Sequence, residues 1–170
     1  MTRIRARGFT ILEIMIVVVV LAILAAIVVP QFADASLDAQ IATLRSTIES
    51  VQRRIDYEYQ ASGTGAYPAT INASWFATGA VPTHPQNVFG VNSIEVVNAP
   101  GKSHPDSKVL QAGSSGAYWY NSAEGIFRAR VVSQGSSAAT LELYNRVNNA
   151  TEADLGDDAG DEEDGGSRWS

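Results

Sequence analysis

The sequence predicts an α+β protein in which one long N-terminal helix packs by its C-terminal half on a small antiparallel β-sheet. Three features of the 170 residues indicate this architecture: a nearly uninterrupted apolar run close to the N-terminus, a heptad-spaced apolar pattern directly after it, and short strand-like segments in the C-terminal half. The helix is expected to cover the sheet, because each element must bury its apolar side against another. The first half of the helix is predicted to be transmembrane.

The apolar run covers residues 9–29, in which only Thr10 and Glu13 are polar. At about 1.5 Å rise per residue a helix of this length spans roughly 31 Å, which matches the ~30 Å hydrocarbon core of a bilayer. Three arginines in residues 1–8 precede it. By the positive-inside rule they place the N-terminus in the cytoplasm and the rest of the chain on the other side of the membrane.

A cleaved secretory signal peptide is the alternative reading of this segment. The stretch Ala33-Asp34-Ala35 offers a small-x-small cleavage site, and cutting there would leave a chain that begins near Ser36. The apolar run is longer than the ~7–15 residues usual in such a peptide, and it contains Glu13. A carboxylate inside a membrane helix costs up to about 3 kcal/mol, so we expect Glu13 to have a function.

Glu13 has two candidate roles. Thr10-Ile11-Leu12-Glu13 fits a helix-capping box, in which the Glu13 side chain would only accept a hydrogen bond from a backbone N–H. A glutamine would meet that need without burying a charge. A cationic partner therefore explains the residue better.

The segment Arg7-Gly8-Phe9-Thr10-Ile11-Leu12-Glu13 resembles the processing signal of type IV pilins and type II secretion pseudopilins. The resemblance implies that prepilin peptidase cuts between Gly8 and Phe9 and methylates the new amine of Phe9. It also implies that Glu13 pairs with the N-terminus of a neighbouring subunit during assembly, and that Pro30 bends or loosens the helix. Pairing would remove the cost of a buried carboxylate that has no partner.

For the whole chain the resemblance implies a ladle-shaped structural subunit of a type II secretion pseudopilus. Such a subunit is a single-pass protein of the bacterial inner membrane with a periplasmic C-terminal domain, and it becomes part of a filament. Its implied partners are prepilin peptidase, identical or related pseudopilin subunits, the inner-membrane secretion platform and membrane lipid. A type IV pilus pilin is the nearest alternative. The chain has no cysteine for the C-terminal disulfide common in pilins, which favours the pseudopilin.

Residues 30–59 are predicted to continue the helix in amphipathic form, and Ser62-Gly63-Thr64-Gly65 to end it. Their apolar side chains recur at alternating steps of four and three residues, which places them in one stripe along a helix. The stripe consists of Leu37, Ile41, Leu44, Ile48, Val51 and Ile55. A stripe this short more often covers a domain's own core than drives a coiled-coil dimer, so we expect it to pack on the rest of its own chain (self-packing).

Residues 60–150 are predicted to form a globular region of loop and sheet. A loop rich in Gly, Pro and Asn extends to about Asn92, with Trp75, Phe76 and Phe89 as expected apolar anchors. Strands are expected at 93–97, 117–121, 126–132 and 140–147. The aromatic strand and Gly turn within 119–129 resemble the terminal sheet of major pseudopilins.

No enzyme is predicted from the residues. The two histidines, His84 and His104, each precede a proline in a predicted loop, and we expect them to be solvated rather than metal ligands. Neither a G-x-S-x-G nor a G-x-x-x-x-G-K motif occurs. The net charge of −6, with no basic run beyond residue 8, argues against a nucleic-acid partner. The remaining alternatives are a membrane-anchored or secreted surface binding protein and, more distantly, a secreted enzyme.

Residues 151–170 are predicted to be an acidic, disordered tail. Calcium stays open as an alternative, because it prefers several oxygen ligands and the resemblance implies a calcium site near the C-terminal end of the sheet in major pseudopilins. The candidate ligands are Asp157, Asp158 and Asp161, although their spacing does not fit an EF-hand loop. No other cofactor is predicted.

Overall fold

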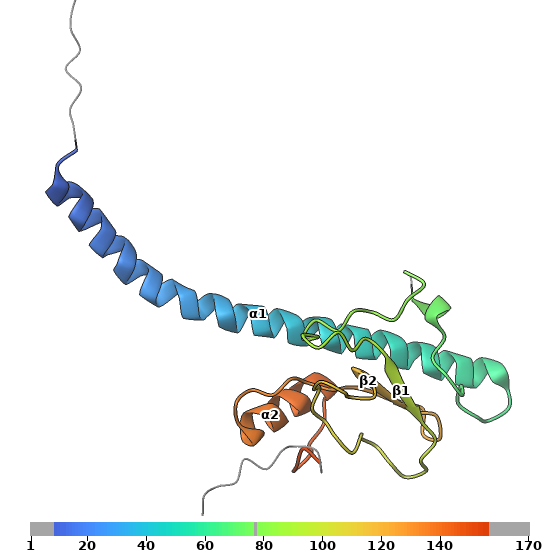
Figure 1. The fold of residues 1–170 in the computed structure, drawn as a ribbon. Helices are drawn as coiled ribbons and strands as arrows, with labels where there is room; N and C mark the ends of the chain where they lie inside the picture. Colours follow the sequence, from blue (N-terminus) through green and yellow to red (C-terminus); the bar gives the residue numbers. More distant parts are fainter. Residues whose placement is uncertain (1–8, 77, 157–170) are drawn as a thin grey trace, which may run out of the picture. The chain divides into compact units, whose positions relative to one another are not determined.

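The computed structural model describes residues 9–76 and 78–156, and for 28–34 the backbone alone. The chain divides into two compact units, Met1–Ala39 and Gln40–Ser170. Helix α1 (Ile11–Ser62) begins in the first unit and continues into the second. The elements that follow it are η1 (Ala73–Trp75), β1 (Ile94–Val97), β2 (Tyr118–Asn121), β3 (Ile126–Ala129) and α2 (Ser137–Asn148). Figure 1 shows their arrangement, which confirms the predicted α+β class.

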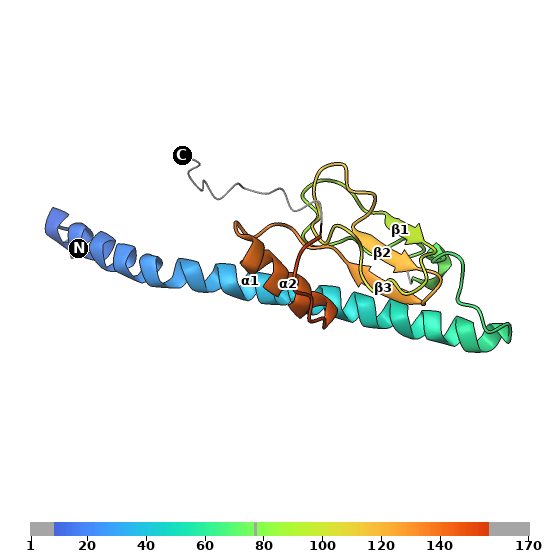
Figure 2. The same ribbon diagram turned by 90° about the horizontal axis from the view of Figure 1, so that it is seen from below.

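The second half of α1 packs on the rest of its own unit. Five of the six stripe residues are buried, with Leu44 and Ile55 fully inaccessible, whereas Leu37 is half-buried and belongs to the first unit. Both ribbon views place the sheet and α2 alongside this half of the helix (Figure 2). Self-packing of the stripe is therefore confirmed. The helix ends at Ser62, directly before Gly63 with its positive φ of 61°.

The three strands form a mixed sheet in the order β1-β2-β3, not the antiparallel sheet predicted from the sequence. Strand β1 runs parallel to β2, whereas β2 and β3 form the expected antiparallel hairpin. The connection 98–117 allows this arrangement, because a parallel pair needs a crossover of a dozen or more residues. The central strand β2 is buried along its whole length.

The strand predicted at 140–147 is wrong, because these residues lie within α2. The Ser136 side chain caps the helix by accepting a hydrogen bond from the Ala139 N–H (3.2 Å). At the other end Asn149 adopts the left-handed conformation (φ 49°) that often terminates helices. The buried side chains of α2 recur at helical spacing: Thr140, Leu143, Tyr144, Val147 and Asn148. Strand β3 also ends earlier than predicted, at Ala129.

The outer edge of β3 is closed by two side-chain amides instead of a fourth strand. Gln52 of α1 accepts a hydrogen bond from the Phe127 N–H (3.2 Å) and donates one to the Gly125 carbonyl (2.7 Å). Asn148 of α2 bonds both the N–H and the carbonyl of Ala129, each at 2.8 Å. Both helices are thus held to the same sheet edge.

We expect Asn148→Leu to lower the free energy of unfolding by about 3 kcal/mol, because it leaves the buried N–H and carbonyl of Ala129 without partners. Urea unfolding of the full chain in detergent, followed by circular dichroism, measures the loss. Asn149→Gly is the matched control at the next position, since glycine adopts a positive φ readily, and it should change stability by less than about 0.5 kcal/mol. Equal stability of the two variants would contradict this role of Asn148.

Candidate functional site

Two of the predicted site residues lie near the start of α1: Phe9 precedes the helix, and Glu13 is in its first turn. Thr10 caps the helix: its Oγ1 accepts a hydrogen bond from the Glu13 N–H (3.2 Å), and its carbonyl accepts one from the Ile14 N–H (3.3 Å). Among the described residues, the exposed Glu13 carboxylate makes no hydrogen bond or ion pair. Only half of the capping box is therefore formed, and the cap uses the Glu13 backbone rather than its charge.

The other predicted site residues are described in part or not at all. Gly8 lies outside the described residues, and Phe9, the first described residue, is 78% exposed. Pro30 lies within α1, and its side chain is not described. The calcium candidates Asp157, Asp158 and Asp161 lie outside the described residues. Within 9–76 and 78–156 no group of three or more acidic or histidine side chains could hold a metal ion.

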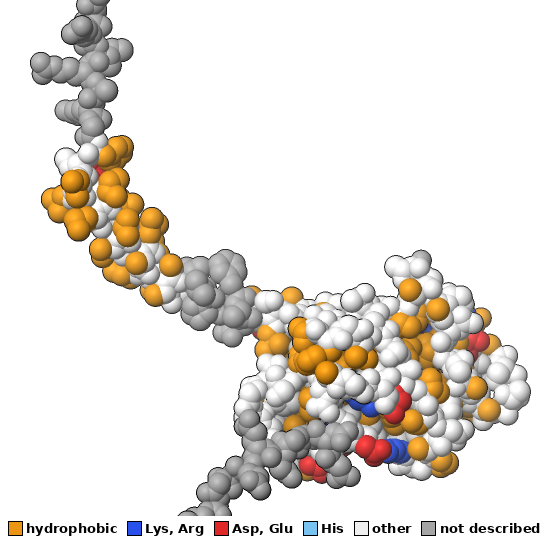
Figure 3. All heavy atoms as spheres, in the orientation of Figure 1, with side chains coloured by type: hydrophobic (Ala, Val, Ile, Leu, Met, Phe, Trp, Pro, Cys, Tyr) orange, Lys and Arg blue, Asp and Glu red, His pale blue; other side chains and the backbone are white. Residues whose placement is uncertain are grey.

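The first part of α1 exposes apolar side chains on every side. All side chains from 9 to 27 are exposed, and their large aliphatic members have exposures from 49% at Val17 to 83% at Ile11. Figure 3 shows this apolar surface along the helix. A helix that is apolar all round normally lies in apolar surroundings. Within the part of the chain that the structure describes, no helix has the length and apolarity needed to cross a membrane.

The structure differs from the predicted tail at residues 151–156, which pack on other parts of the second unit. Leu155 is buried, and its carbonyl accepts a hydrogen bond from the Lys108 N–H (3.1 Å). The buried Lys108 ammonium lies 3.2 Å from a Glu152 carboxylate oxygen and 3.6 Å from one of Asp154. A buried ammonium needs such partners, so the acidic residues here are structural.

The prediction that both histidines are solvated is wrong. The side chain of His104 is only 15% exposed and lies between the Tyr144 hydroxyl (2.9 Å from Nδ1) and Glu152 (3.3 Å from Nε2). His84 is 1% exposed. Sequence reasoning had no signal for this, because the covering residues are distant in the chain.

The surroundings of His84 select its neutral form. Its Nε2 lies 2.8 Å from the Arg130 carbonyl, so this nitrogen donates, and its Nδ1 accepts from the Gln86 N–H (3.2 Å). A second ring proton would point at the Gln86 N–H. Burial lowers the pKa of His84 from 6.5 to about 4, although the bond to Arg130 opposes the shift.

We expect His84 to make stability depend on pH. The folded chain keeps His84 neutral to about pH 4, whereas the unfolded chain takes up a proton near pH 6.5. The unfolding free energy should therefore fall between pH 6.5 and pH 4, with roughly 3 kcal/mol coming from His84. His84→Gln keeps a donor for Arg130 and does not titrate, so its stability should fall less over this range. Equal pH slopes for the two proteins in urea unfolding would refute the assignment.

Comparison with known proteins gives a class for the N-terminal segment. Residues 3–29 match the family model described as "Prokaryotic N-terminal methylation motif". This match contains the predicted cleavage pair, Gly8 and Phe9, and Glu13. Residues 3–29 thus carry an N-terminal methylation motif of the kind found in type IV pilin-like proteins.

The relatives found by sequence agree with this class. The chain is 29% identical over 97 residues to two proteins of Pseudomonas aeruginosa named "Fimbrial protein", which covers 57% of this chain and 56% of each relative. It is 40% identical over 70 residues to "Type II secretion system core protein G" of Pseudomonas aeruginosa, which covers 41% of this chain and 48% of the relative. The chain spans about half the length of the curated relatives it matches. No solved structure matches it significantly.

Proposed function

We propose that this chain is a structural subunit of a type II secretion pseudopilus. Prepilin peptidase cuts it between Gly8 and Phe9 and methylates Phe9, and the subunit then joins a helical periplasmic filament that drives protein export. The observation that carries the proposal is the exposed apolar start of α1 within a methylation motif, beside a Glu13 carboxylate that the helix cap does not use.

Residues 9–29 occupy two successive environments in this proposal. Before assembly they anchor the subunit in the inner membrane, and afterwards they lie in the filament core among the same segments of other subunits. Each large aliphatic side chain gains about 1.5–3 kcal/mol on leaving water, so lipid or neighbouring helices are favoured over solvent. Pro30 falls at the end of this segment, where a bend or local loosening would adjust the helix to the filament.

Glu13 sets the axial register between neighbouring subunits. Cleavage creates an ammonium group on Phe9, and Glu13 of a neighbouring copy pairs with it. Two unit charges about 4 Å apart attract by about 4 kcal/mol at an effective dielectric constant of 20. A subunit shifted along the filament axis would lose this pair and leave a carboxylate buried alone, which favours one register.

A type IV pilus pilin is the second candidate, and the longer match to the two fimbrial proteins favours it. The higher identity to the secretion core protein, and the lack of any cysteine for a pilin-type disulfide, favour the pseudopilin. Expressing the chain with either assembly system and recovering surface filaments would separate the two. Recovery with the pilus system alone would overturn the pseudopilin assignment.

Processing is the first test of the proposal. Coexpressed with prepilin peptidase, the chain should lose residues 1–8 and begin with N-methylated Phe9, as measured by mass spectrometry of the intact protein. Gly8→Arg should block the cut, because a bulky charged side chain replaces the small residue before it, whereas Gly8→Ala should be tolerated. A mature chain that begins near Ser36 would instead indicate a signal peptide, and an uncut chain a simple membrane anchor.

The second test separates the charge of Glu13 from the helix cap. We expect Glu13→Gln to be cleaved normally but to reduce sheared or cross-linked filament more than tenfold, because a loss of even about 1.4 kcal/mol per subunit contact changes an association constant tenfold. Thr10→Val is the matched control, since it removes the capping oxygen and leaves the charge. Wild-type amounts of filament from Glu13→Gln would remove the pairing mechanism and leave the processing assignment standing.

A further inference from the structure

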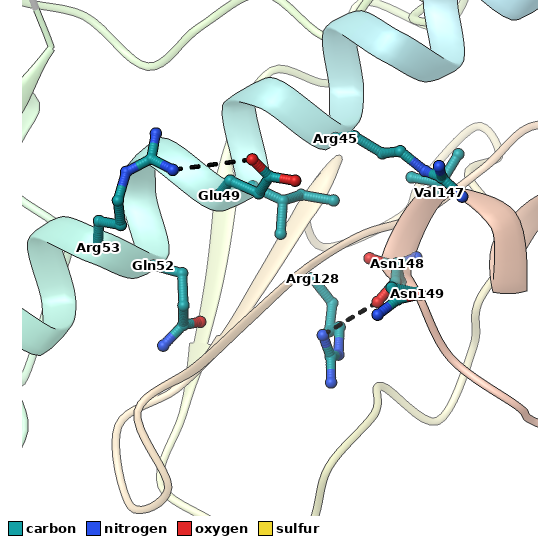
Figure 4. A pocket seen from close by; sticks show the side chains of 9 residues that line it. Arg45, Glu49, Gln52, Arg53, Arg128, Val147, Asn148 and Asn149 are labelled. Atoms are coloured by element: carbon teal, nitrogen blue, oxygen red, sulfur yellow. Dashed lines mark hydrogen bonds and ion pairs between the residues drawn. The ribbon is translucent and has the colours of Figure 1, made fainter.

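A groove of about 660 Å³ lies between the second half of α1, strand β3 and the C-terminal end of α2. Three arginines line it, Arg45 and Arg53 from α1 and Arg128 from β3, together with the acidic Glu49. Figure 4 shows these side chains around the groove. All of them belong to the second unit. The charged lining is therefore positive overall.

Two of the arginines also cap α2, but capping uses only part of their hydrogen-bonding capacity. Arg45 Nε donates to the Arg146 carbonyl (2.5 Å), and Arg128 Nη1 donates to the Asn148 carbonyl (3.3 Å). A guanidinium group carries five N–H donors. Arg128 Nε is buried and has no hydrogen-bond partner among the described residues. Capping alone therefore leaves a buried donor without an acceptor. Burial also disfavours the charged form of Arg128 and lowers its pKa, so a nearby anion would stabilise the guanidinium charge.

The third arginine is only weakly engaged. Arg53 lies 3.7 Å from Glu49, and their side chains are 71% and 67% exposed. Such solvated ion pairs contribute little to stability, so an incoming carboxylate can compete with Glu49. The groove thus offers guanidinium groups to an acidic ligand, and guanidinium pairs with carboxylates in a planar, bidentate geometry.

The chain itself contains such a ligand. The segment 157–170 has a single basic residue, Arg168, and six acidic ones: Asp157, Asp158, Asp161, Glu162, Glu163 and Asp164. It follows Gly156, which lies so close to Asp106 that an added Cβ would be 1.5 Å from the Asp106 carbonyl oxygen. The segment therefore starts from a fixed point.

The residues just before Gly156 connect to the elements that line the groove. Glu152, four residues before Gly156, is near enough to Arg128 to raise its pKa against the effect of burial. The Glu152 carbonyl also accepts a hydrogen bond from Asn145 of α2 (2.9 Å). The fourteen residues 157–170 can extend at most about 46–50 Å, so the segment is long enough to reach the groove.

We propose that the acidic segment 157–170 docks in the groove of its own chain, with its carboxylates on Arg45, Arg53 and Arg128. The docked segment neutralises the groove and gives the buried Arg128 donor an acceptor. The interaction is independent of processing and filament assembly.

Paramagnetic relaxation tests the docking directly, because a chain without cysteine accepts one specific spin label. Ser167→Cys carries the nitroxide, and amide signals are recorded from the full chain in detergent micelles. At low salt we expect the signals of residues 45–53 to lose at least about half their intensity, and to regain it in 1 M salt, where the screening length is only about 3 Å. Full signal intensity at low salt would overturn the proposal.

Matched variants identify the groove as the docking site. Arg45→Gln with Arg53→Gln should abolish the broadening, whereas Arg54→Gln should leave it unchanged, because Arg54 pairs with Glu58 (2.6 Å) and does not line the groove. If the double variant does not fold, Glu162→Gln with Glu163→Gln weakens the ligand instead and should reduce the broadening. Unchanged broadening in the folded charge variants would refute docking on these arginines.

A mixed sample decides whether the segment docks in its own chain. One copy carries the isotope label without nitroxide, and the other carries the nitroxide without isotope. The proposal predicts no broadening in this mixture. Broadening as strong as in the doubly labelled chain would mean that the segment binds a second copy, and would overturn docking within one chain.

Discussion

The hydrogen bonds from Gln52 and Asn148 to the outer edge of β3 are the interaction on which the second unit depends. A three-stranded sheet with four-residue strands has few ladder bonds, and an open edge would present unpaired backbone groups. Each amide can both donate and accept, so one side chain satisfies two backbone groups of the edge. Because Gln52 belongs to α1 and Asn148 to α2, the same bonds fix both helices on the sheet. The buried stripe of α1 then completes the core.

Buried polar groups replace disulfides in holding the loops of this cysteine-free chain. Asn121 at the end of β2 bonds the N–H and carbonyl of Ala99, at 3.0 and 2.6 Å. Arg130 bonds the Ser107 carbonyl (2.9 Å) and the Gly116 carbonyl (2.6 Å), and it pairs with Glu95 of β1. Since removing one partner from such a network leaves the other unsatisfied, the loops are held by interactions that are costly to break. The long loop is held by the buried His84 rather than by Phe89, which is 43% exposed.

The two units have opposite relations to their surroundings. The second unit buries its apolar side chains and satisfies its sheet edge internally. The described part of the first unit presents apolar side chains and a free carboxylate, so its stable environment must come from outside the unit. This division is what the proposed filament subunit requires of its N-terminal helix. The groove arginines add a charged surface to that domain.

The sequence by itself determined the features that local patterns encode. These are the methylation motif, the apolar run, the buried stripe of α1 and the β2–β3 hairpin. The hairpin turns at Gly125, and glycine readily adopts the positive φ of 67° found there. The tertiary structure decided what depends on distant partners. The direction of β1 depends on where segment 98–117 returns, and residues 140–147 contain apolar positions that suit a strand or a helix until packing selects one. The burial of His84, the ion pairs of Lys108 and the arginine groove arise only when segments far apart in the chain meet, and no local pattern records such meetings.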